Sequence, residues 1–294
     1  MKIILSLVWL VILSHVSFTV FAQTPKKDYV LYSAVYAWYG QLDIAGIPEQ
    51  DVLIGKGVND FSYLQTEQGL SGAHHILNIN LLDDNEHQMQ VEVTLDYYYQ
   101  VSSQDTAYQG QSSAALPARY LVQRLILEKD PLGVIDSHNV INELDAYPSR
   151  FIPSAERNLI RGLLYQWTDL LDHPEEVNVH AAIDEWVDIN ANFQGAELNV
   201  IEPHHYFFLL EALGHRFSRR EIKNVRIIPL ENEASTYQVH FEYQWMVLNS
   251  FGEKELAQIG VRLKVKIVDK RAVIKEYEEV YLPPVTDLGA EIRC

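Results

Sequence analysis

Two long segments of the chain alternate apolar and polar residues with the period of two that is typical of a half-buried strand. The first runs from Met89 to Val101 and the second from Tyr237 to Val247. Shorter strand-like segments accompany them, at 121–127 and 134–140 in the first half and at 222–228, 259–268 and 272–281 in the second. An apolar face and a polar face on each strand are what an antiparallel sheet requires. Each half of the chain is therefore expected to form a meander of long antiparallel strands.

Apolar residues at helical spacing precede the strands in both halves. The pattern covers Leu31 to Leu42 in the first half and residues 155–171 in the second, with Ser154 as a candidate N-cap. Shorter helices are expected at 181–187 and 205–213, the latter ending at Gly214, because glycine favours helix C-caps. Helices that come first and strands that follow predict an α+β fold with the helices packed on one face of the sheet.

Short sequence matches connect the two halves in the same order. Residues 36–43 and 165–172 share Tyr, Trp, Leu and Asp at an offset of 129 positions. Further matches at offsets of 146 and 148 begin at Ile76 and at Gln90. We interpret them as an internal duplication, whose second copy carries extra residues after Asp172.

The duplication predicts two consecutive domains. We expect a shorter, divergent copy at 28–146 and a complete copy at 150–286, each with N-terminal helices packed on a long curved antiparallel sheet. The joint falls near 147–150, where Pro148 and Ser149 interrupt both periodicities.

The first 22 residues have the pattern of a secretory signal peptide. Lys2 supplies a positive charge, residues 3–13 are apolar, and Val20 and Ala22 precede a cleavage site that leaves Gln23 as the first mature residue. An uncleaved membrane anchor is the alternative, although polar residues interrupt the stretch that would have to span the bilayer. We expect an exported protein, periplasmic or secreted, with no membrane span after cleavage.

The composition excludes several classes of protein. Among 294 residues, 23 Lys and Arg stand against 40 Asp and Glu, a net charge of −17. This acidic surplus argues against nucleic-acid binding, which needs clustered cations. The single cysteine, Cys294, excludes an internal disulfide framework and a cysteine-based zinc site. The sequence has no phosphate-binding loop, His-Glu-x-x-His motif or Gly-x-Ser-x-Gly motif. We expect neither a metal nor a cofactor.

The order of expected elements in the second copy resembles that of the nuclear transport factor 2-like superfamily, which includes ketosteroid isomerases and polyketide cyclases. Three helices and then four strands follow one another over residues 151–283, and the likeness extends more loosely to 28–142. The resemblance implies a curved sheet wrapped around helices, with an apolar pocket between them in at least one copy. It implies no catalytic residues, because no Asp, His or Tyr motif matches a particular enzyme branch.

Two groups of histidines are candidates for catalysis. His180, Asp184 and Asp188 recur at helical spacing, and a solvated helix face explains them better than an acid–base or metal cluster does. His204 and His205 begin a helix, where an imidazole is able to serve as a general base near neutral pH. Capping and surface roles are commoner at such positions.

The last strand offers a pair of carboxylates. Alternation along the strand allows two inward-facing sets, one with Glu276 and Glu278 and the other with Tyr277 and Glu279. If the first set faces inward, crowding of the two carboxylates would raise the pKa of one of them, as an acid catalyst needs. The second set is favoured near the end of the strand because its tyrosine side chains have more apolar surface to bury than the side chains of the first set. The dipeptide His74-His75, ahead of a strand in the first copy, carries less weight.

Aromatic residues are concentrated on the expected inner faces of the strands. Core packing explains most of the 17 Tyr, 10 Phe and 5 Trp. In the second copy, however, Phe241, Tyr243 and Trp245 share one face of a strand, and Trp167 on the first helix is expected opposite them. We predict that these four side chains line a pocket for a hydrophobic or cyclic ligand.

Two classes of function remain. The first is an exported, non-catalytic module that binds a small hydrophobic or cyclic ligand or a partner protein, and the lack of a sharp polar constellation in the sequence favours it. The second is a cofactor-independent isomerase, dehydratase or cyclase that acts on a small apolar substrate by proton transfer. Neither class involves nucleic acid, and a homodimer is left open.

Overall fold

The computed structural model describes residues 25–45, 59–64, 72–99, 116–129, 132–144, 147–149, 154–174, 178–196, 202–212 and 214–283. The predicted cleavage site and Cys294 lie outside the described residues. The chain forms two compact units. We call residues 30–166 with 267–272 the N-terminal unit, and residues 1–29, 167–266 and 273–294 the C-terminal unit. No helix in the described part is long and apolar enough to cross a membrane.

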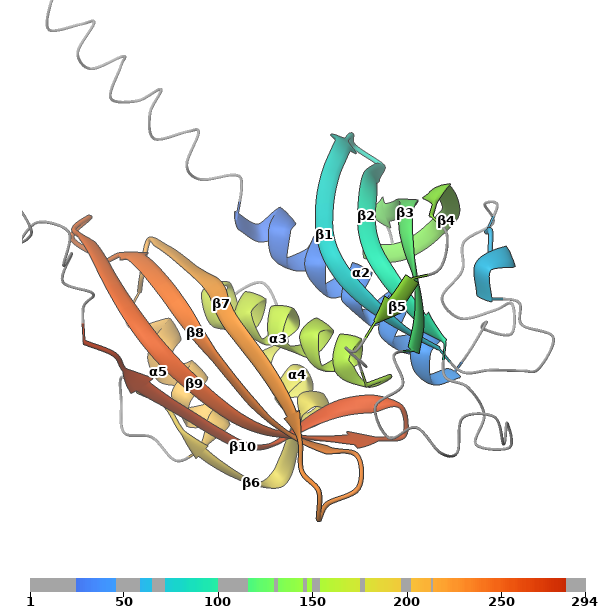
Figure 1. The fold of residues 1–294 in the computed structure, drawn as a ribbon. Helices are drawn as coiled ribbons and strands as arrows, with labels where there is room; N and C mark the ends of the chain where they lie inside the picture. Colours follow the sequence, from blue (N-terminus) through green and yellow to red (C-terminus); the bar gives the residue numbers. More distant parts are fainter. Residues whose placement is uncertain are drawn as a thin grey trace, which may run out of the picture. The chain divides into compact units, whose positions relative to one another are not determined.

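The N-terminal unit combines helix α2 (Pro25–Ala45) with an antiparallel sheet (Figure 1). The strands are β1 (Gly72–Asp84), β2 (Gln88–Tyr99), β3 (Leu116–Lys129), β4 (Leu132–Glu143) and β5 (Tyr147–Ser149). They follow the order β1-β2-β3-β4, and β5 pairs with β3. A short 3-10 turn, η1 (Ser62–Leu64), precedes β1. The unit also takes in the first turns of helix α3 (Arg157–Asp172).

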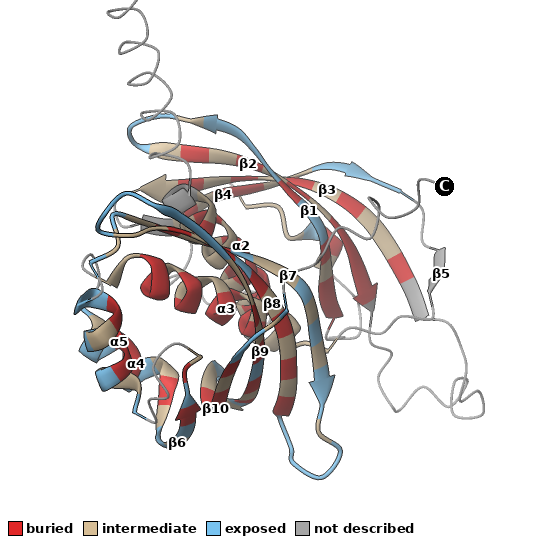
Figure 2. Cartoon of the chain, turned by 90° about the vertical axis from the view of Figure 1, so that its left-hand side faces the viewer, coloured by how far each residue is buried: buried red, intermediate tan, exposed pale blue. Residues whose placement is uncertain are grey.

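The alternating pattern of β2 determines which face of this sheet is buried. Met89, Val91, Val93 and Leu95 are at most 2% exposed, while the residues between them are only partly buried (Figure 2). Their side chains join those of α2, Val35 among them, in one apolar cluster. Burial of both apolar faces against each other holds helix and sheet together.

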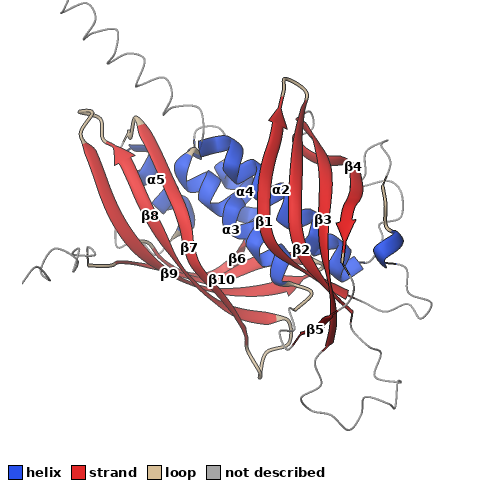
Figure 3. Cartoon of the chain, turned by 45° about the horizontal axis from the view of Figure 1, so that its top comes forward, coloured by secondary structure: helices blue, strands red, loops and turns tan. Residues whose placement is uncertain are grey.

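The C-terminal unit repeats this arrangement with more helices (Figure 3). After the end of α3 come α4 (Val179–Trp186), β6 (Val187–Gln194) and α5 (Pro203–Ala212). The strands β7 (Phe217–Pro229), β8 (Thr236–Leu248), β9 (Lys254–Val268) and β10 (Arg271–Tyr281) then form a meander. The sheet order is β6-β10-β9-β8-β7, with β6 parallel to β10. The predicted α+β class is confirmed.

Strand β6 is the element that the sequence pattern did not predict. The chain passes directly from α4 into this strand at Val187, where a helix was expected to end. The strand lacks clear alternation because it lies at the edge of the sheet, with Ile189 97% exposed. Gly214 has a φ of 59°, the left-handed conformation predicted for it. The domain boundaries at 146 and 150 stay a prediction.

Candidate active site

A chain of buried polar side chains runs through the interior of the N-terminal unit. Asp43 lies in the last turn of α2, His74 near the start of β1 and Tyr63 in η1. The Nδ1 atom of His74 lies 2.5 Å from Oδ1 of Asp43, and its Nε2 atom lies 2.9 Å from the hydroxyl of Tyr63. Asn158 on α3 donates from its amide to Oδ2 of Asp43 at 2.9 Å and to the backbone oxygen of His74 at 2.8 Å. All four residues are at most 6% exposed.

The hydrogen-bond partners of His74 assign its ring proton. Nδ1 faces the Asp43 carboxylate and Nε2 faces the Tyr63 hydroxyl. A carboxylate accepts only, which assigns a ring proton to Nδ1. In the neutral imidazole, Nε2 is then the acceptor of the Tyr63 O–H. Beyond His74, the Tyr39 hydroxyl donates to Oε1 of Gln123 at 2.5 Å.

Aromatic rings enclose the imidazole on several sides. The ring centroids of Tyr39 and Tyr97 each lie 4.8 Å from that of His74, and Tyr63 meets Tyr97 edge to face. A Cβ atom at Gly72 would lie 2.0 Å from the Tyr97 hydroxyl oxygen, so glycine is required for the tyrosine to take this place. The polar chain is therefore surrounded by aromatic rings.

Burial keeps the phenols of this site neutral. It raises the pKa of Tyr63, despite the hydrogen bond from Gln123, and it raises that of Tyr39 well above the ordinary value. Burial also raises the pKa of the Asp43 carboxyl, while the hydrogen bonds from His74 and Asn158 oppose that rise. Neutral phenols are hydrogen-bond donors, so Tyr63 can stabilise a developing negative charge on an oxygen.

His138 on β4 is a second fully buried imidazole in this unit. Its ring stacks on Phe61 at 5.5 Å and lies 5.8 Å from that of Tyr63. Burial lowers the pKa of His138 to about 4, and the neighbouring His74 adds to that decrease. His138 is thus held neutral by its surroundings.

We expect the free energy of unfolding to fall between about pH 6.5 and pH 4. The folded protein keeps His138 neutral down to pH about 4, whereas the unfolded chain protonates an imidazole at its ordinary pKa of 6.5. Above that pH neither state binds the proton. Below it the unfolded state binds more protons, which costs about 3 kcal/mol at about 1.4 kcal/mol per pKa unit.

Urea unfolding across this pH range tests the assignment. His138→Phe should retain the packing on Phe61 and lose most of the acid-dependent decrease in stability. His87→Phe, at an exposed position, is the control and should unfold with the pH dependence of the unmodified protein. A His138→Phe protein with that same dependence would contradict the assignment.

The C-terminal unit contains a buried ion pair of its own. The guanidinium Nη1 of Arg220 contacts Oδ1 of Asp172, and the two side chains are at most 2% exposed. The backbone N–H of Arg220 and the hydroxyls of Ser218 and Tyr29 also contact this carboxylate, at 2.6, 2.6 and 2.7 Å. The guanidinium carbon lies 4.6 Å from the ring centroid of Trp245. Four groups thus stabilise one buried carboxylate.

The four side chains predicted to bind a ligand all lie in the core of the C-terminal unit. Trp167 packs edge to face on Phe207 at 5.3 Å and contacts Tyr277, so it faces β10 and α5. Tyr243 shares a 3.0 Å hydrogen bond with Thr168, the helix residue next to Trp167. Phe241 packs on Tyr243 at 5.0 Å. Their predicted role in binding stays a prediction.

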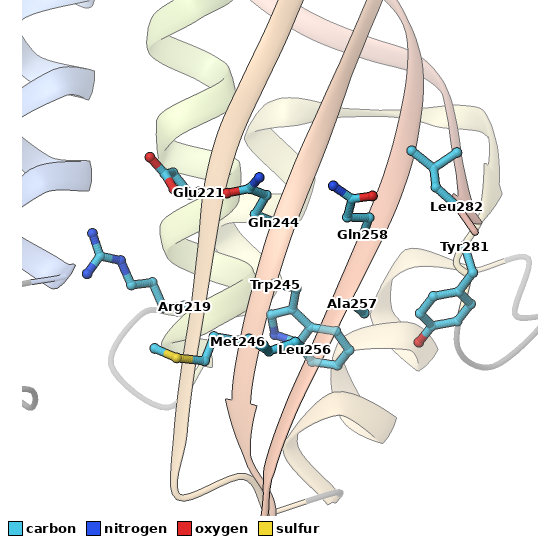
Figure 4. A pocket seen from close by; sticks show the side chains of 10 residues that line it. All are labelled: Arg219, Glu221, Gln244, Trp245, Met246, Leu256, Ala257, Gln258, Tyr281 and Leu282. Carbon is cyan, nitrogen blue, oxygen red and sulfur yellow. The ribbon is translucent and has the colours of Figure 1, made fainter. Parts of the chain in front are cut away.

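A cavity of about 740 Å³ lies beside Trp245 (Figure 4). Gln244, Gln258, Leu256 and Tyr281 are among the residues that line it. Gln244 alternates along β8 with the buried Tyr243 and Trp245, so the cavity opens on the face of the sheet opposite the core. The predicted pocket was placed on the inner face instead.

The carboxylates of β10 divide between its two faces. Glu276 lies 3.8 Å from Lys264, and Glu278 forms an ion pair with Arg262, so both lie on the solvent side. Glu279 is 2% exposed and accepts hydrogen bonds from Tyr206 and Tyr277. The inward set containing Tyr277 and Glu279 is thus confirmed near the end of this strand.

The candidate histidines of the C-terminal unit lie at the surface between α4 and α5. The His180 and His204 rings stack at 4.8 Å, and Nε2 of His204 is 3.7 Å from Asp184. His205 is exposed, and Asp188 forms an ion pair with Lys275. Among the described residues, no group of three or more His, Cys, Asp or Glu side chains is placed to hold a metal ion.

The sequence analysis gave too little weight to the residues of the N-terminal unit. Asp43 figured there only as a repeat position, and Tyr63 did not figure at all. The signal available in the sequence was a polar residue on an otherwise apolar face of a helix or strand. Asp43 follows Val35 and Tyr39 at steps of four, and His74 shares strand parity with Ile76. A buried polar residue is more informative than an exposed apolar one.

Comparisons with known proteins concern the fold. No family model matches the sequence, and no curated protein matches it. Solved structures do match. A protein provisionally described as an aromatic ring hydroxylase, from Novosphingobium aromaticivorans, is 14% identical, covers 46% of this chain and 94% of its own, and has a TM-score of 0.38. Each of these matches covers about 45% of this chain.

Two further solved structures match part of the chain. A provisionally assigned scytalone dehydratase from Novosphingobium aromaticivorans is 17% identical, covers 44% of this chain and 85% of its own, and has a TM-score of 0.37. A hexachlorocyclohexane dehydrochlorinase from Novosphingobium barchaimii is 11% identical, covers 44% of this chain and 88% of its own, with a TM-score of 0.37. At such identities the likeness extends to the fold alone.

Proposed function

We propose that the N-terminal unit is a cofactor-independent acid–base catalyst, with His74 as the base. The observation that carries this proposal is the pair of buried contacts that places Asp43 at Nδ1 of His74 and Tyr63 at Nε2. Asp43 orients the ring and stabilises the imidazolium that forms when Nε2 takes a proton. Asn158 in turn holds Asp43. A positioned base of this kind typically contributes about 10²–10⁴-fold to a rate.

The surroundings of His74 favour a small, cyclic, apolar substrate that carries a carbonyl group. Tyr39 and Tyr97 offer ring faces, and the Tyr63 O–H, which faces Nε2 of His74 in the free protein, would turn to a substrate oxygen when Nε2 engages the substrate proton. Nε2 removes a proton from the carbon next to the carbonyl, and the C–H electron pair moves to form an enol or enolate. The proton then returns to another carbon, which is an isomerisation, or leaves with a hydroxyl group as water, which is a dehydration.

This proposal takes the second of the two function classes that the sequence allows. In the C-terminal unit the predicted aromatic residues pack in the core, and Tyr243 and Glu279 are engaged in buried hydrogen bonds with Thr168 and Tyr206. Binding of a ligand by that unit remains a second candidate, supported by the cavity beside Trp245. Export by the signal peptide is likewise a proposal.

A proton-abstraction probe tests the main proposal without knowledge of the natural substrate. 5-Nitrobenzisoxazole is a small planar compound whose ring opens when a base removes one carbon-bound proton, and the coloured nitrophenolate reports the rate. We expect the mature protein to open the ring faster than free imidazole at the same concentration. A rate no greater than that of free imidazole would contradict the proposal.

A further inference from the structure

The buried pairs of the two units correspond through the offsets of the sequence repeat. The offset of 129 that joins the helix motifs relates Asp43 to Asp172, and the offset of 146 that joins the strands relates His74 to Arg220. Trp245 follows Tyr97 by 148 positions, the third offset of the repeat.

The contacts of the carboxylates correspond as well. The amide of Asn158 contacts both Oδ2 of Asp43 and the backbone oxygen of His74. The hydroxyl of Tyr29, 129 positions before Asn158, lies 2.7 Å from Oδ2 of Asp172 and 2.6 Å from the backbone oxygen of Arg220. In each unit, therefore, one helix side chain holds the carboxylate and the strand backbone together.

The strand contacts of the cationic partners follow the same scheme. The backbone N–H of His74 donates to Asp43 at 3.1 Å, and that of Arg220 donates to Asp172 at 2.6 Å. His74 is the cross-strand partner of Tyr97, with ring centroids 4.8 Å apart. Arg220 is the cross-strand partner of Trp245, at 4.6 Å. A chance resemblance of two buried pairs would not reproduce the register.

We propose that the C-terminal unit carries a second, non-catalytic copy of the same framework, in which Arg220 takes the place of the base. This inference rests on the proposed function of His74. An arginine keeps its proton at every accessible pH and has no acceptor atom, so it cannot remove a proton from a substrate. The framework thus holds a base in the N-terminal unit and a permanent ion pair at the equivalent place of the C-terminal unit.

A substitution that restores an imidazole tests the equivalence. In Arg220→His, nuclear magnetic resonance should show a new ring N–H signal, strongly downfield and protected from exchange, because the introduced Nδ1 donates to Asp172. Arg219→His is the matched control, since Arg219 is the neighbouring residue with a side chain 39% exposed, and it should show no such signal. Identical spectra for the two variants would overturn the inference.

A second measurement applies even if Arg220→His fails to fold. In a His74→Gln background, the rate of 5-nitrobenzisoxazole opening should be the same with and without Arg220→Met, because the C-terminal unit contributes no base. A further drop in rate on adding Arg220→Met, in protein that remains folded by circular dichroism, would overturn the inference. The resonance experiment does not depend on turnover, so its failure is separable from failure of the proposed function.

Discussion

Replacement of His74 by Gln should lower the rate of 5-nitrobenzisoxazole opening by about 10²–10⁴-fold, the usual contribution of a positioned base. Gln has a similar polar tip but no basic nitrogen. Asp43→Asn should cause a loss in the same range, because an amide that donates to Nδ1 reverses the ring tautomer and removes the charge that stabilises the imidazolium.

His75→Gln is the matched control for this prediction. His75 is the next residue of β1, so its side chain points to the opposite face of the sheet. Its replacement should leave the rate within about two-fold, since a base on the opposite face cannot take part in general-base catalysis at the site. Equal losses from His74→Gln and His75→Gln would show that the site is not specific, and a His74→Gln protein with unchanged rate would refute the assignment of the base.

The second large effect concerns stability. Asp172→Asn should lower the free energy of unfolding by about 3–5 kcal/mol, because it leaves the Arg220 guanidinium buried without its counter-ion. The loss also includes weaker hydrogen bonds from Ser218 and Tyr29, which then meet an amide. Urea unfolding followed by circular dichroism measures the change.

An exposed ion pair of the same unit provides the comparison. Glu221 contacts Lys223, with side chains 51% and 41% exposed, so Glu221→Gln should cost less than about 1 kcal/mol. A loss of that small size for Asp172→Asn as well would mean that the buried pair contributes no more than a solvated one. It would also weaken the contrast drawn between the two units.

The helices and the meander strands were predictable because each buries one complete face. In β2 and β8, nearly every second residue is apolar and buried, and the amphipathic stripe of α3 is equally regular. Strand β6 was not predictable on that basis. Its place depends on pairing with β10, a contact that the sequence of β6 does not itself encode.

The orientation of β10 shows a different limit. Its register with β6 shifts between Ile274 and Glu276, so Ile274 is buried while the inward set near the end of the strand contains Tyr277 and Glu279. Strict alternation cannot place all three residues inward. The size of the aromatic side chains gave the correct face for the end of the strand, and the bulge explains its beginning.

The candidate site could be predicted only in part. His74 and Asp43 lie 31 positions apart, on a strand and on a helix, and Asn158 comes from another helix much later in the chain. No short sequence motif encodes these contacts, because they depend on how the helix ends pack against a strand. The proposed repeat nevertheless pairs Asp43 with Asp172, at an offset of 129 positions.

The most direct test of the account is the tautomer of His74 in the folded protein. Long-range ¹H–¹⁵N spectra at neutral pH should show a protonated Nδ1, an unprotonated Nε2 and a downfield Nδ1 proton, all lost in His74→Gln. Asp43→Asn should remove the downfield shift. An Nε2-protonated ring, or one that exchanges freely between tautomers in the unmodified protein, would contradict the claim that Asp43 holds His74 as a base.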